Sequence, residues 1–311
     1  MATDRSWMID EAPDLSGRVA LVTGANSGLG FETTRGLASK GAHVVLACRD
    51  VDKGNSAMAR IRAEFPKASL EVMGLDLADL TAVRSFADAF SQRYPALHIL
   101  GNNAGVMALP YRQTADGFEM QFGTNHLGHF ALTGLLMEQI RNTAAARIVT
   151  VSSGAHRFGK INLDRLQGEN PYRKWAAYAR SKLANVLFAY DLQRRLDVYD
   201  VDAVSVAADP GYAATNLQYA GPRMEGSALW TRIMMVANRL LAQSAEMGAQ
   251  PILYAATSPA VQGGDYVGPG GLLGLRGYPQ KVRSGRASYD RETAAKLWAA
   301  SEEFTGVKYL S

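Results

Sequence analysis

The chain has 311 residues, of which 47% are hydrophobic and 20% charged, an ordinary balance for a soluble globular protein. Its net charge of +4 comes from scattered residues and does not indicate a nucleic-acid-binding protein. A single cysteine, Cys48, excludes an intrachain disulfide and favours a cytoplasmic location. Because Met1 to Leu15 lacks an apolar signal core and no long uncharged apolar run occurs, neither a signal peptide nor a transmembrane segment is expected.

Short apolar runs alternate with helical stretches, a pattern typical of a parallel sheet with helices on both faces. The expected strands are Val19–Thr23, His43–Cys48, Leu70–Leu75, Ile99–Asn102, Arg147–Ser152, Asp202–Ala207 and Asp265–Val267. The expected helices are Gly28–Lys40, Lys53–Glu64, Leu80–Arg93, Ala115–Asn142, Ala176–Leu196 and Ala245–Ala256. The pattern predicts the α/β class, with one Rossmann-type doubly wound sheet of about seven strands.

A single domain over 1–311 is expected, with an N-terminal extension (1–16), a segment after the sixth strand (212–244) and a C-terminal extension (270–311). The 212–244 segment carries a broad apolar helical face made by Leu229, Trp230, Ile233, Met234, Val236, Ala237, Leu240 and Leu241. A lid over the ligand-binding edge and plain core packing explain this face about equally well, and a membrane-surface helix explains it less well.

The segment Thr23–Gly30, TGANSGLG, joins the first expected strand to the first expected helix. Glycine lets the backbone adopt positive φ angles and approach a ligand closely, and a helix N-terminus offers N–H groups and partial positive charge. The arrangement therefore suits a phosphate group. Its G-x-x-x-G-x-G spacing differs from the commoner G-x-G-x-x-G fingerprint, so alone it also fits any α/β protein.

Tyr178 and Lys182 are four residues apart, early in an expected helix, so their side chains share one helix face. A free tyrosine has a pKa of about 10 and is a poor acid–base catalyst at neutral pH, but a neighbouring cation lowers that pKa. Because tyrosine and lysine are common on helices, this spacing alone is a weak sign of catalysis.

Further polar residues fall where expected strands end, at the edge that binds ligands in open α/β sheets. They are Asn102–Gly105 (NNAG), Ser152 and Ser153, and Asp209 with the Pro210-Gly211 turn. Asn125 falls instead within a long expected helix, where asparagine is unfavourable and requires another explanation.

In this order and at these spacings, the motifs together resemble the short-chain dehydrogenase/reductase family. The resemblance extends over about Gly17 to Val267 and rests on the glycine turn, Asn102–Gly105, Asn125, Ser153, Tyr178 with Lys182, and Pro210-Gly211. The joint match is highly specific, although each motif alone is not.

The resemblance implies a role for four residues. Tyr178 resembles the general acid/base, and Ser153 resembles the residue that hydrogen-bonds the reacting carbonyl oxygen. Lys182 resembles the residue that binds the nicotinamide ribose and lowers the tyrosine pKa, and Asn125 the residue that holds a water for the proton relay. Besides Tyr178 and Lys182, the cofactor contacts expected from the resemblance are Gly24, Asn26, Ser27, Gly28, Leu29, Gly30, Arg49, Asp76, Leu77, Asn103, Ala104, Gly105, Pro210, Gly211 and Thr215.

NADP(H) is the expected cofactor. In NAD-binding relatives an acidic residue ends the second strand and bonds the ribose hydroxyls. Cys48 occupies that place here and Arg49 follows it, where a guanidinium would make charge-assisted hydrogen bonds to the additional phosphate. Asp76 and Leu77 resemble the family's contact with the adenine ring.

Asn26–Gly30, Ala47–Asp50 and Asn125–Phe130 narrow the resemblance to the branch of retinol-dehydrogenase-like and protochlorophyllide-reductase-like proteins. Three features depart from that pattern. Gly101 replaces the usual aliphatic residue before Asn102, Asp209 stands where His or Asn often precedes Pro-Gly, and no hydrophobic anchor precedes Gly17. The last departure weakens a retinoid assignment.

The expected function is hydride transfer between NADP(H) and a carbonyl or alcohol group of a small molecule. Trp230, Met234 and Met235 in the 212–244 segment favour a bulky, apolar substrate. The alternatives are reduction of a C=C bond or a tetrapyrrole, as in protochlorophyllide reductase, and a regulator that senses NADP(H) without turnover.

Family analogy implies a homodimer or homotetramer, in which Leu183, Val186, Leu187 and Tyr190 could form an apolar contact stripe. Packing against the chain's own sheet would use the same residues.

His126 and His129 have a spacing that can ligate a metal, but no partner cysteine or H-E-x-x-H pattern accompanies them. No metal site is therefore expected. Cys48 is expected to pack in the core rather than act as a nucleophile.

Overall fold

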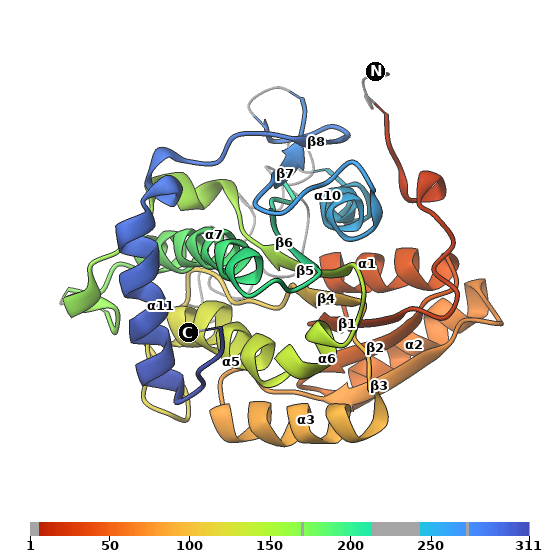
Figure 1. Ribbon diagram of the computed structural model, residues 1–311, viewed down its shortest axis with the longest axis horizontal. Coiled ribbons are helices and arrows are strands. Elements are labelled where there is room, and N and C mark those ends of the chain that lie inside the picture. The colour runs from red at the N-terminus through yellow and green to blue at the C-terminus, as the bar shows by residue number, and fades with distance from the viewer. Residues whose placement is uncertain (1–5, 169–170, 213–242, 272–273, 311) are drawn as a thin grey trace, which may run out of the picture.

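The computed structural model describes residues 6–168, 171–212, 243–271 and 274–310, and within these residues the chain forms one eight-stranded sheet (Figure 1). The strand order is β3-β2-β1-β4-β5-β6-β7-β8. All neighbouring strands are parallel except β7 and β8. The strands are β1 (Val19–Thr23), β2 (His43–Cys48), β3 (Leu70–Gly74), β4 (Ile99–Asn102), β5 (Ala146–Val151), β6 (Ala203–Ala208), β7 (Tyr266–Pro269) and β8 (Pro279–Lys281). The order reverses between β1 and β4, where doubly wound sheets bind their ligands.

Helices cover both faces of the sheet (Figure 1). Helices α1 (Gly28–Ser39), α2 (Val51–Glu64) and α10 (Ala245–Thr257) share one apolar core with the sheet. Helices α3 (Leu80–Arg93), α5 (Gly128–Leu135), α6 (Met137–Arg141), α7 (Lys174–Val198) and α11 (Arg291–Thr305) share the other. The shorter helical segments are η1 (Ile9–Glu11), α4 (Met120–Phe122), η2 (Gly123–Leu127), η3 (Gly154–Phe158), η4 (Leu163–Arg165) and η6 (Arg286–Tyr289). Because both faces are covered, the central strands are continuous apolar runs rather than alternating ones.

The expected fold class is confirmed, and every expected strand occurs with its ends within two residues of the expected positions. The sheet has eight strands rather than about seven, because β8 pairs antiparallel with β7 at the edge. Its sequence, PQK, is short and begins with proline, so no apolar pattern signals it; proline is tolerated at a strand start on an edge. Helix α11 is likewise not among the expected helices.

The prediction of one continuous helix over Ala115–Asn142 is wrong. The chain turns at Gly117, and the Glu119 carboxylate accepts hydrogen bonds from the N–H groups of Gln121 and Phe122, so α4 begins at Met120. A π-helical turn, η2, follows, and Leu136 separates α5 from α6. The 3.6-residue apolar period persists through these breaks, which is why the sequence pattern does not reveal them.

The apolar stripe of α7 packs inside the chain. Leu183 and Leu187 lie with Leu297 of α11 in one cluster, and Val186 and Tyr190 lie in another with β6 and β7. The stripe is therefore used by the subunit itself, and it no longer supports an oligomeric contact.

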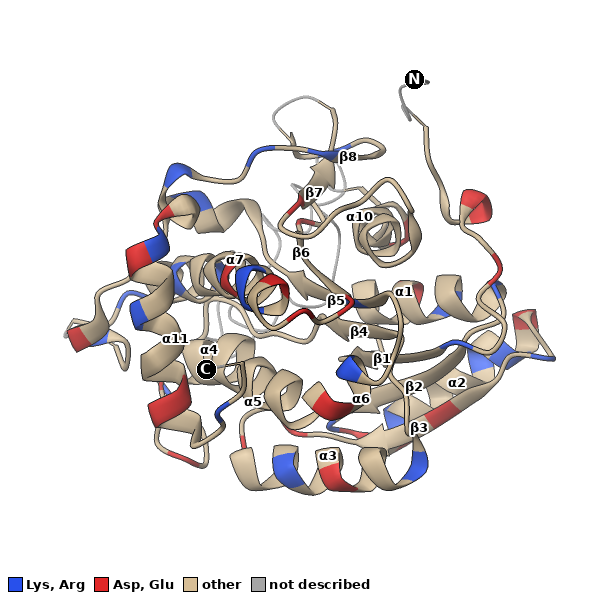
Figure 2. Ribbon diagram, viewed as in Figure 1, with Lys and Arg blue, Asp and Glu red and all other residues tan. Residues whose placement is uncertain are grey.

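Most of the 212–244 segment, including Trp230, Met234 and Met235, lies outside the described residues, as does Thr215. Within the described ranges no helix has the length and apolar character needed to cross a membrane. Figure 2 shows Lys and Arg interspersed with Asp and Glu, for example along α3.

Candidate active site

The glycine turn lies at the end of β1 and is fixed to the end of β4. Thr23 Oγ1 accepts hydrogen bonds from the N–H groups of Asn103 and Ala104, both at 2.9 Å, and Asn103 Nδ2 donates to Thr23 O at 2.7 Å. Gly24 has a φ of +66°, and a Cβ on Gly30 would lie 2.3 Å from Gly24 O. Only glycine fits these two positions, so the turn closes tightly against α1.

The first turn of α1 is left open toward this edge of the sheet. Its N-cap residue, Ser27, makes no side-chain capping bond, whereas Asp50 caps α2 and Asp79 caps α3. The first N–H groups of a helix need a partner, and a phosphate supplies both acceptors and the charge that the helix dipole favours. The turn therefore fits the diphosphate of a dinucleotide.

Helix α7 is fixed to the end of β5. Lys182 Nζ and Asn185 Nδ2 donate to Val151 O at 3.1 and 3.0 Å, and Ser152 Oγ donates to Lys182 O at 2.9 Å. These bonds place Tyr178, which is 5% exposed, beside Ser153, whose side chain hydrogen-bonds it. Three of the four residues that sequence reasoning singled out for catalysis, Ser153, Tyr178 and Lys182, are thus brought together at the carboxyl end of β5.

Burial determines the protonation of this group. It raises the pKa of Tyr178 to about 12, because desolvation outweighs the hydrogen bond from Ser153. It lowers the pKa of Lys182 to about 8, although the carboxylate of Asp209 opposes that shift. The expected lowering of the tyrosine pKa by Lys182 is not present in the protein by itself; Lys182 Nζ lies 5.9 Å from the centre of the Tyr178 ring.

Asn125 lies in the π-helical turn η2, and its side chain is fully buried. Its Oδ1 accepts from Val106 N at 2.7 Å, and its Nδ2 donates to Val106 O at 2.9 Å and to Ser181 Oγ at 2.9 Å. The side chain thus ties the loop after β4 to α7, which explains an asparagine inside a helical stretch. π-Turns are frequent at functional sites.

His129 is a site residue that sequence reasoning considered only as a metal ligand. Its Nε2 lies 2.9 Å from Thr23 Oγ1, and its Nδ1 lies 3.0 Å from the carbonyl oxygen of Asn125. The imidazole therefore joins the glycine turn to the π-turn. His126 hydrogen-bonds Ser301 Oγ of α11 instead, at 2.9 Å. Among the described residues no group of three or more possible metal ligands occurs.

The other predicted cofactor residues lie along the same edge. Arg49 follows β2 and is exposed, whereas Cys48 is buried and its thiol pKa is raised by burial, which suits packing rather than reactivity. Asp76 Oδ1 accepts from Ala78 N at 2.9 Å in the turn after β3, and Leu77 is buried beside Gly128.

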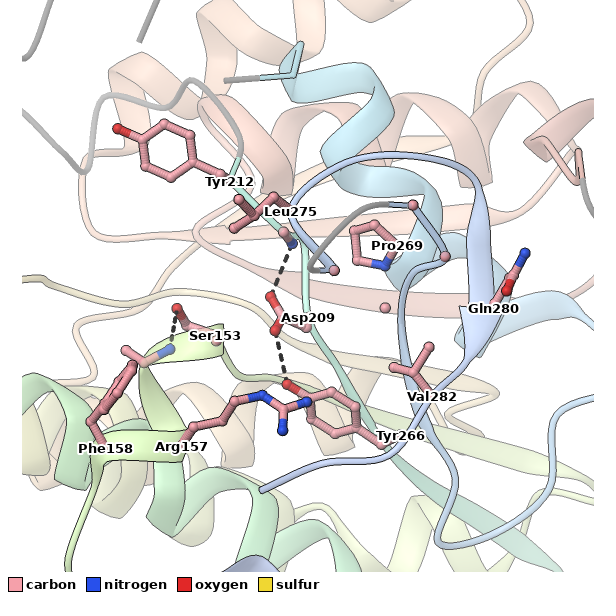
Figure 3. A pocket seen from close by; sticks show the side chains of 17 residues that line it. Ser153, Arg157, Phe158, Asp209, Tyr212, Tyr266, Pro269, Leu275, Gln280 and Val282 are labelled. Atoms are coloured by element: carbon pink, nitrogen blue, oxygen red, sulfur yellow. Dashed lines mark hydrogen bonds between the residues drawn. The ribbon is translucent and has the colours of Figure 1, made fainter. Parts of the chain in front are cut away.

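A cavity of about 570 Å³ opens beside Ser153 (Figure 3). Segments after β5 and β6 and the β7–β8 hairpin form its walls. Its larger side chains are Arg157, Phe158, Asp209, Tyr212, Tyr266, Pro269, Leu275, Gln280 and Val282. The cavity thus has a mixed apolar and polar surface, and Ser153 is the predicted catalytic residue among those that line it.

Comparisons with known proteins agree with this geometry. The profile of the short chain dehydrogenase family matches residues 18–225. Human retinol dehydrogenase 12 is 41% identical over 297 residues, which cover 95% of this chain and 88% of that protein. Polyprenol dehydrogenase of Danio rerio is 38% identical over 311 residues, covering 98% of this chain and 92% of that protein.

Solved structures show the same fold. An uncharacterized protein from Mycobacterium paratuberculosis is 41% identical, with a TM-score of 0.80 and coverage of 98% of this chain and 99% of that chain. A Beutenbergia cavernae protein described as an NAD(P)-dependent gluconate 5-dehydrogenase, with bound NADP, is 26% identical, with a TM-score of 0.62 and coverage of 81% and 95%. The present chain therefore belongs to the short-chain dehydrogenase/reductase family of oxidoreductases, in its retinol-dehydrogenase-like branch.

Proposed function

We propose that the protein is an NADP(H)-dependent oxidoreductase that interconverts a carbonyl and an alcohol group, with Tyr178 as general acid/base. The observation that carries the proposal is the contact of Tyr178 with Ser153 beside Lys182, at the carboxyl end of β5. A tyrosine with a pKa of about 12 is protonated at neutral pH, so it can donate its proton to a carbonyl oxygen.

The chain's own residues fit a nicotinamide dinucleotide. An ammonium group has three N–H donors, and among the described residues Lys182 Nζ has one acceptor, Val151 O. The remaining donors suit ribose hydroxyls, and the open first turn of α1 suits the diphosphate. The nicotinamide supplies the hydride when it is bound.

Three observations support NADP(H) over NAD(H). The acid expected at the end of β2 is replaced by Cys48, which is buried. Arg49, which follows it, is exposed and can meet a phosphate. The Beutenbergia cavernae relative was crystallised with NADP.

In this proposal, Ser153 hydrogen-bonds the carbonyl oxygen and fixes it against the Tyr178 hydroxyl. Tyr178 donates its proton to that oxygen as the alcohol forms, and takes the proton back in the reverse direction. Lys182 holds the cofactor ribose and places a positive charge near the tyrosine, which stabilises a phenolate. Asn125 holds the π-turn against the loop after β4 through its hydrogen bonds with Val106.

The substrate we propose is bulky and mainly apolar. Phe158, Pro269, Leu275 and Val282 line the cavity, and Phe158 and Leu275 are exposed at 82% and 47%. Relatives in the same branch are named for retinol and polyprenol. Each additional buried methylene should contribute about 0.8 kcal/mol to binding.

The test is NADPH oxidation with methyl ketones and aldehydes of increasing chain length, and with all-trans-retinal. We expect kcat/KM to rise with size until the cavity is full, and Tyr178→Phe to abolish most turnover with every substrate. A preference for short, polar carbonyls would overturn the substrate assignment.

Two other functions remain testable in the same assay. An enone distinguishes the proposed carbonyl reductase from a C=C reductase, since the first yields the allylic alcohol and the second the saturated ketone. A regulator would bind NADPH tightly and oxidise it with none of the substrates, but sensing alone does not require the hydrogen bond between Tyr178 and Ser153 beside Lys182.

Assembly and location are separate proposals, made from family analogy and from the single cysteine. A homodimer or homotetramer should sediment as such at micromolar concentration, through a surface other than the buried α7 stripe. A cytoplasmic protein should fractionate with the soluble material of its host cell.

A further inference from the structure

Asp209 is a buried carboxylate in the wall of the substrate cavity. It follows β6, is 7% exposed, and lines the cavity together with Ser153 (Figure 3). The family resemblance does not account for it, because His or Asn often stands at this place. Burying an acid is costly unless it has partners, so the residue requires a reason.

Two donors hold the carboxylate in place. Gly211 N donates to Oδ1 at 2.9 Å, and the Tyr266 hydroxyl donates to Oδ2 at 3.0 Å. Tyr266 in turn lies 3.2 Å from His156 Nδ1, and His156 Nε2 accepts from Gly285 N at 2.7 Å. The carboxylate is therefore oriented by β7 and η3 rather than free to rotate.

The carboxylate keeps the capacity to accept further hydrogen bonds. Each carboxylate oxygen has two acceptor positions, and within the part of the chain that the structure describes each oxygen of Asp209 uses one of them. Burial raises the pKa of Asp209, while the bonds from Gly211 and Tyr266 and the nearby charge of Arg157 oppose that change. These contacts favour the ionised, acceptor-only form, although burial has the larger effect on the pKa of Asp209.

The acceptor lies close to the reacting group. A Cβ placed on Gly154, the residue after Ser153, would lie 3.8 Å from Asp209 Oδ2. Ser153 and Asp209 also line the same cavity, and the charge of Asp209 acts on the pKa values of both Tyr178 and Lys182. A carbonyl held by Ser153 would therefore share its cavity with the Asp209 carboxylate. An anionic group there would be repelled by the carboxylate, whereas a hydroxyl group can donate a hydrogen bond to it.

We propose that Asp209 is a substrate-binding residue that accepts a hydrogen bond from a hydroxyl group one or two carbons from the reacting carbonyl. The substrate class is then a mainly apolar α- or β-hydroxy carbonyl compound, or the corresponding diol. The inference rests on the proposed function, because it takes the carbonyl to be held by Ser153.

The experiment compares kcat/KM for 2-decanone, 1-hydroxy-2-decanone and 4-hydroxy-2-decanone. A hydrogen bond to a charged acceptor should favour at least one hydroxylated ketone by about tenfold to a hundredfold in the wild type. Asp209→Asn removes the charge and should reduce that ratio to a few-fold. Asp209→His, which places a residue usual in the family there, should reduce it as well if the Asn variant folds poorly.

The ratio between matched substrates is the decisive readout, because a purely structural effect lowers both rates alike. Gln280→Leu is the matched control, since Gln280 is another polar residue lining the cavity. Its ratio should stay near the wild-type value. Equal rates for the three ketones in the wild type, or a ratio that survives both Asp209 variants, would overturn the inference. A preference for 2-oxodecanoate would also overturn it, by assigning recognition to Arg157.

A second measurement does not depend on turnover. Calorimetry with the NADP⁺ complex of Tyr178→Phe, in which turnover is blocked, should show tighter binding of 1,2-decanediol than of 2-decanol, and adding Asp209→Asn should remove most of the difference. If no carbonyl is reduced, the proposed function fails, while this difference still tests Asp209. Equal binding of the two alcohols would overturn the role of Asp209 and leave the proposed function standing.

Discussion

Burial acts on Tyr178 and Lys182 in opposite directions. Desolvation disfavours the charged form of each, so it raises the tyrosine pKa to about 12 and lowers the lysine pKa to about 8. The roles of Tyr178 as a proton donor and of Lys182 as a cation near neutral pH therefore depend on which groups fill the site. Ribose hydroxyls at Lys182 and a carbonyl at Ser153 would supply the hydrogen bonds that water, excluded by the fold, does not make.

Removing the Tyr178 hydroxyl tests its proposed chemistry. Tyr178→Phe keeps the ring and deletes the proton, so kcat should fall by about 10²- to 10⁴-fold, the usual contribution of general acid catalysis. NADPH affinity, measured by fluorescence titration, should remain because the hydroxyl is not a phosphate contact. Unchanged turnover with a confirmed substrate would exclude the role.

Arg49 tests the choice of cofactor. Arg49→Ala removes a charge-assisted contact worth about 1.5–3 kcal/mol, so NADPH should bind about tenfold to a hundredfold more weakly. NADH affinity should change little, because NADH lacks the additional phosphate. Calorimetry with both cofactors checks the expectation, and tighter binding of NADH than of NADPH by the wild type would contradict it.

At the scale of elements, the parallel strands and their ends could be predicted because buried strands are short apolar runs between turn residues. The motif residues could be placed because parallel strands all end at one edge, so Ser153 and Asn103 had to lie near each other. The π-turn at Asn125 could not be predicted, since it depends on the contacts of that side chain with Val106. Nor could the role of Asp209, whose partner Tyr266 is far away in sequence.

His129 joins two of these elements, and its removal should affect both. His129→Leu removes the hydrogen bonds of the imidazole to Thr23 Oγ1 and to the Asn125 carbonyl, each of which typically contributes about 0.5–1.5 kcal/mol to the unfolding free energy. Because Thr23 anchors the glycine turn, NADPH affinity should fall as well. Urea unfolding and cofactor titration measure the two effects.

His126→Leu is the control for that prediction. His126 lies on the same helical stretch but hydrogen-bonds Ser301 of α11, away from the glycine turn. The His126→Leu variant should be less stable than the wild type but should bind NADPH with the same affinity. A normal NADPH affinity in His129→Leu would show that the bridge does not position the turn.

For the whole molecule, the C-terminal helix α11 completes the second core. Trp298 packs on Phe130 and Phe188, with ring centres 5.0 and 5.9 Å apart, and Arg195 lies over its ring at 4.1 Å. Leu297 of the same helix packs with Leu183 and Leu187, two of the α7 residues that the sequence alone left available to another subunit. Side-chain periodicity cannot distinguish these two uses, because both require the same apolar stripe.

The last prediction concerns the pH dependence of folding stability. All five histidines of the chain, His43, His98, His126, His129 and His156, have lowered pKa values, with burial as the largest cause. The pKa values of His126 and His129 fall to about 3 and about 4. Between these values and the ordinary one of about 6.5, the unfolded chain binds more protons than the folded chain.

Stability should therefore be fully present above pH 6.5 and decline as the pH falls below it. From pH 7 to pH 5, each of the two most buried histidines should remove about 2 kcal/mol from the unfolding free energy. Urea unfolding followed by tryptophan fluorescence at both pH values measures the loss. His126→Leu removes one titrating group, so its stability should fall less steeply over this range. A wild-type stability that stays level or rises from pH 7 to pH 5 would contradict neutral, buried imidazoles as the cause.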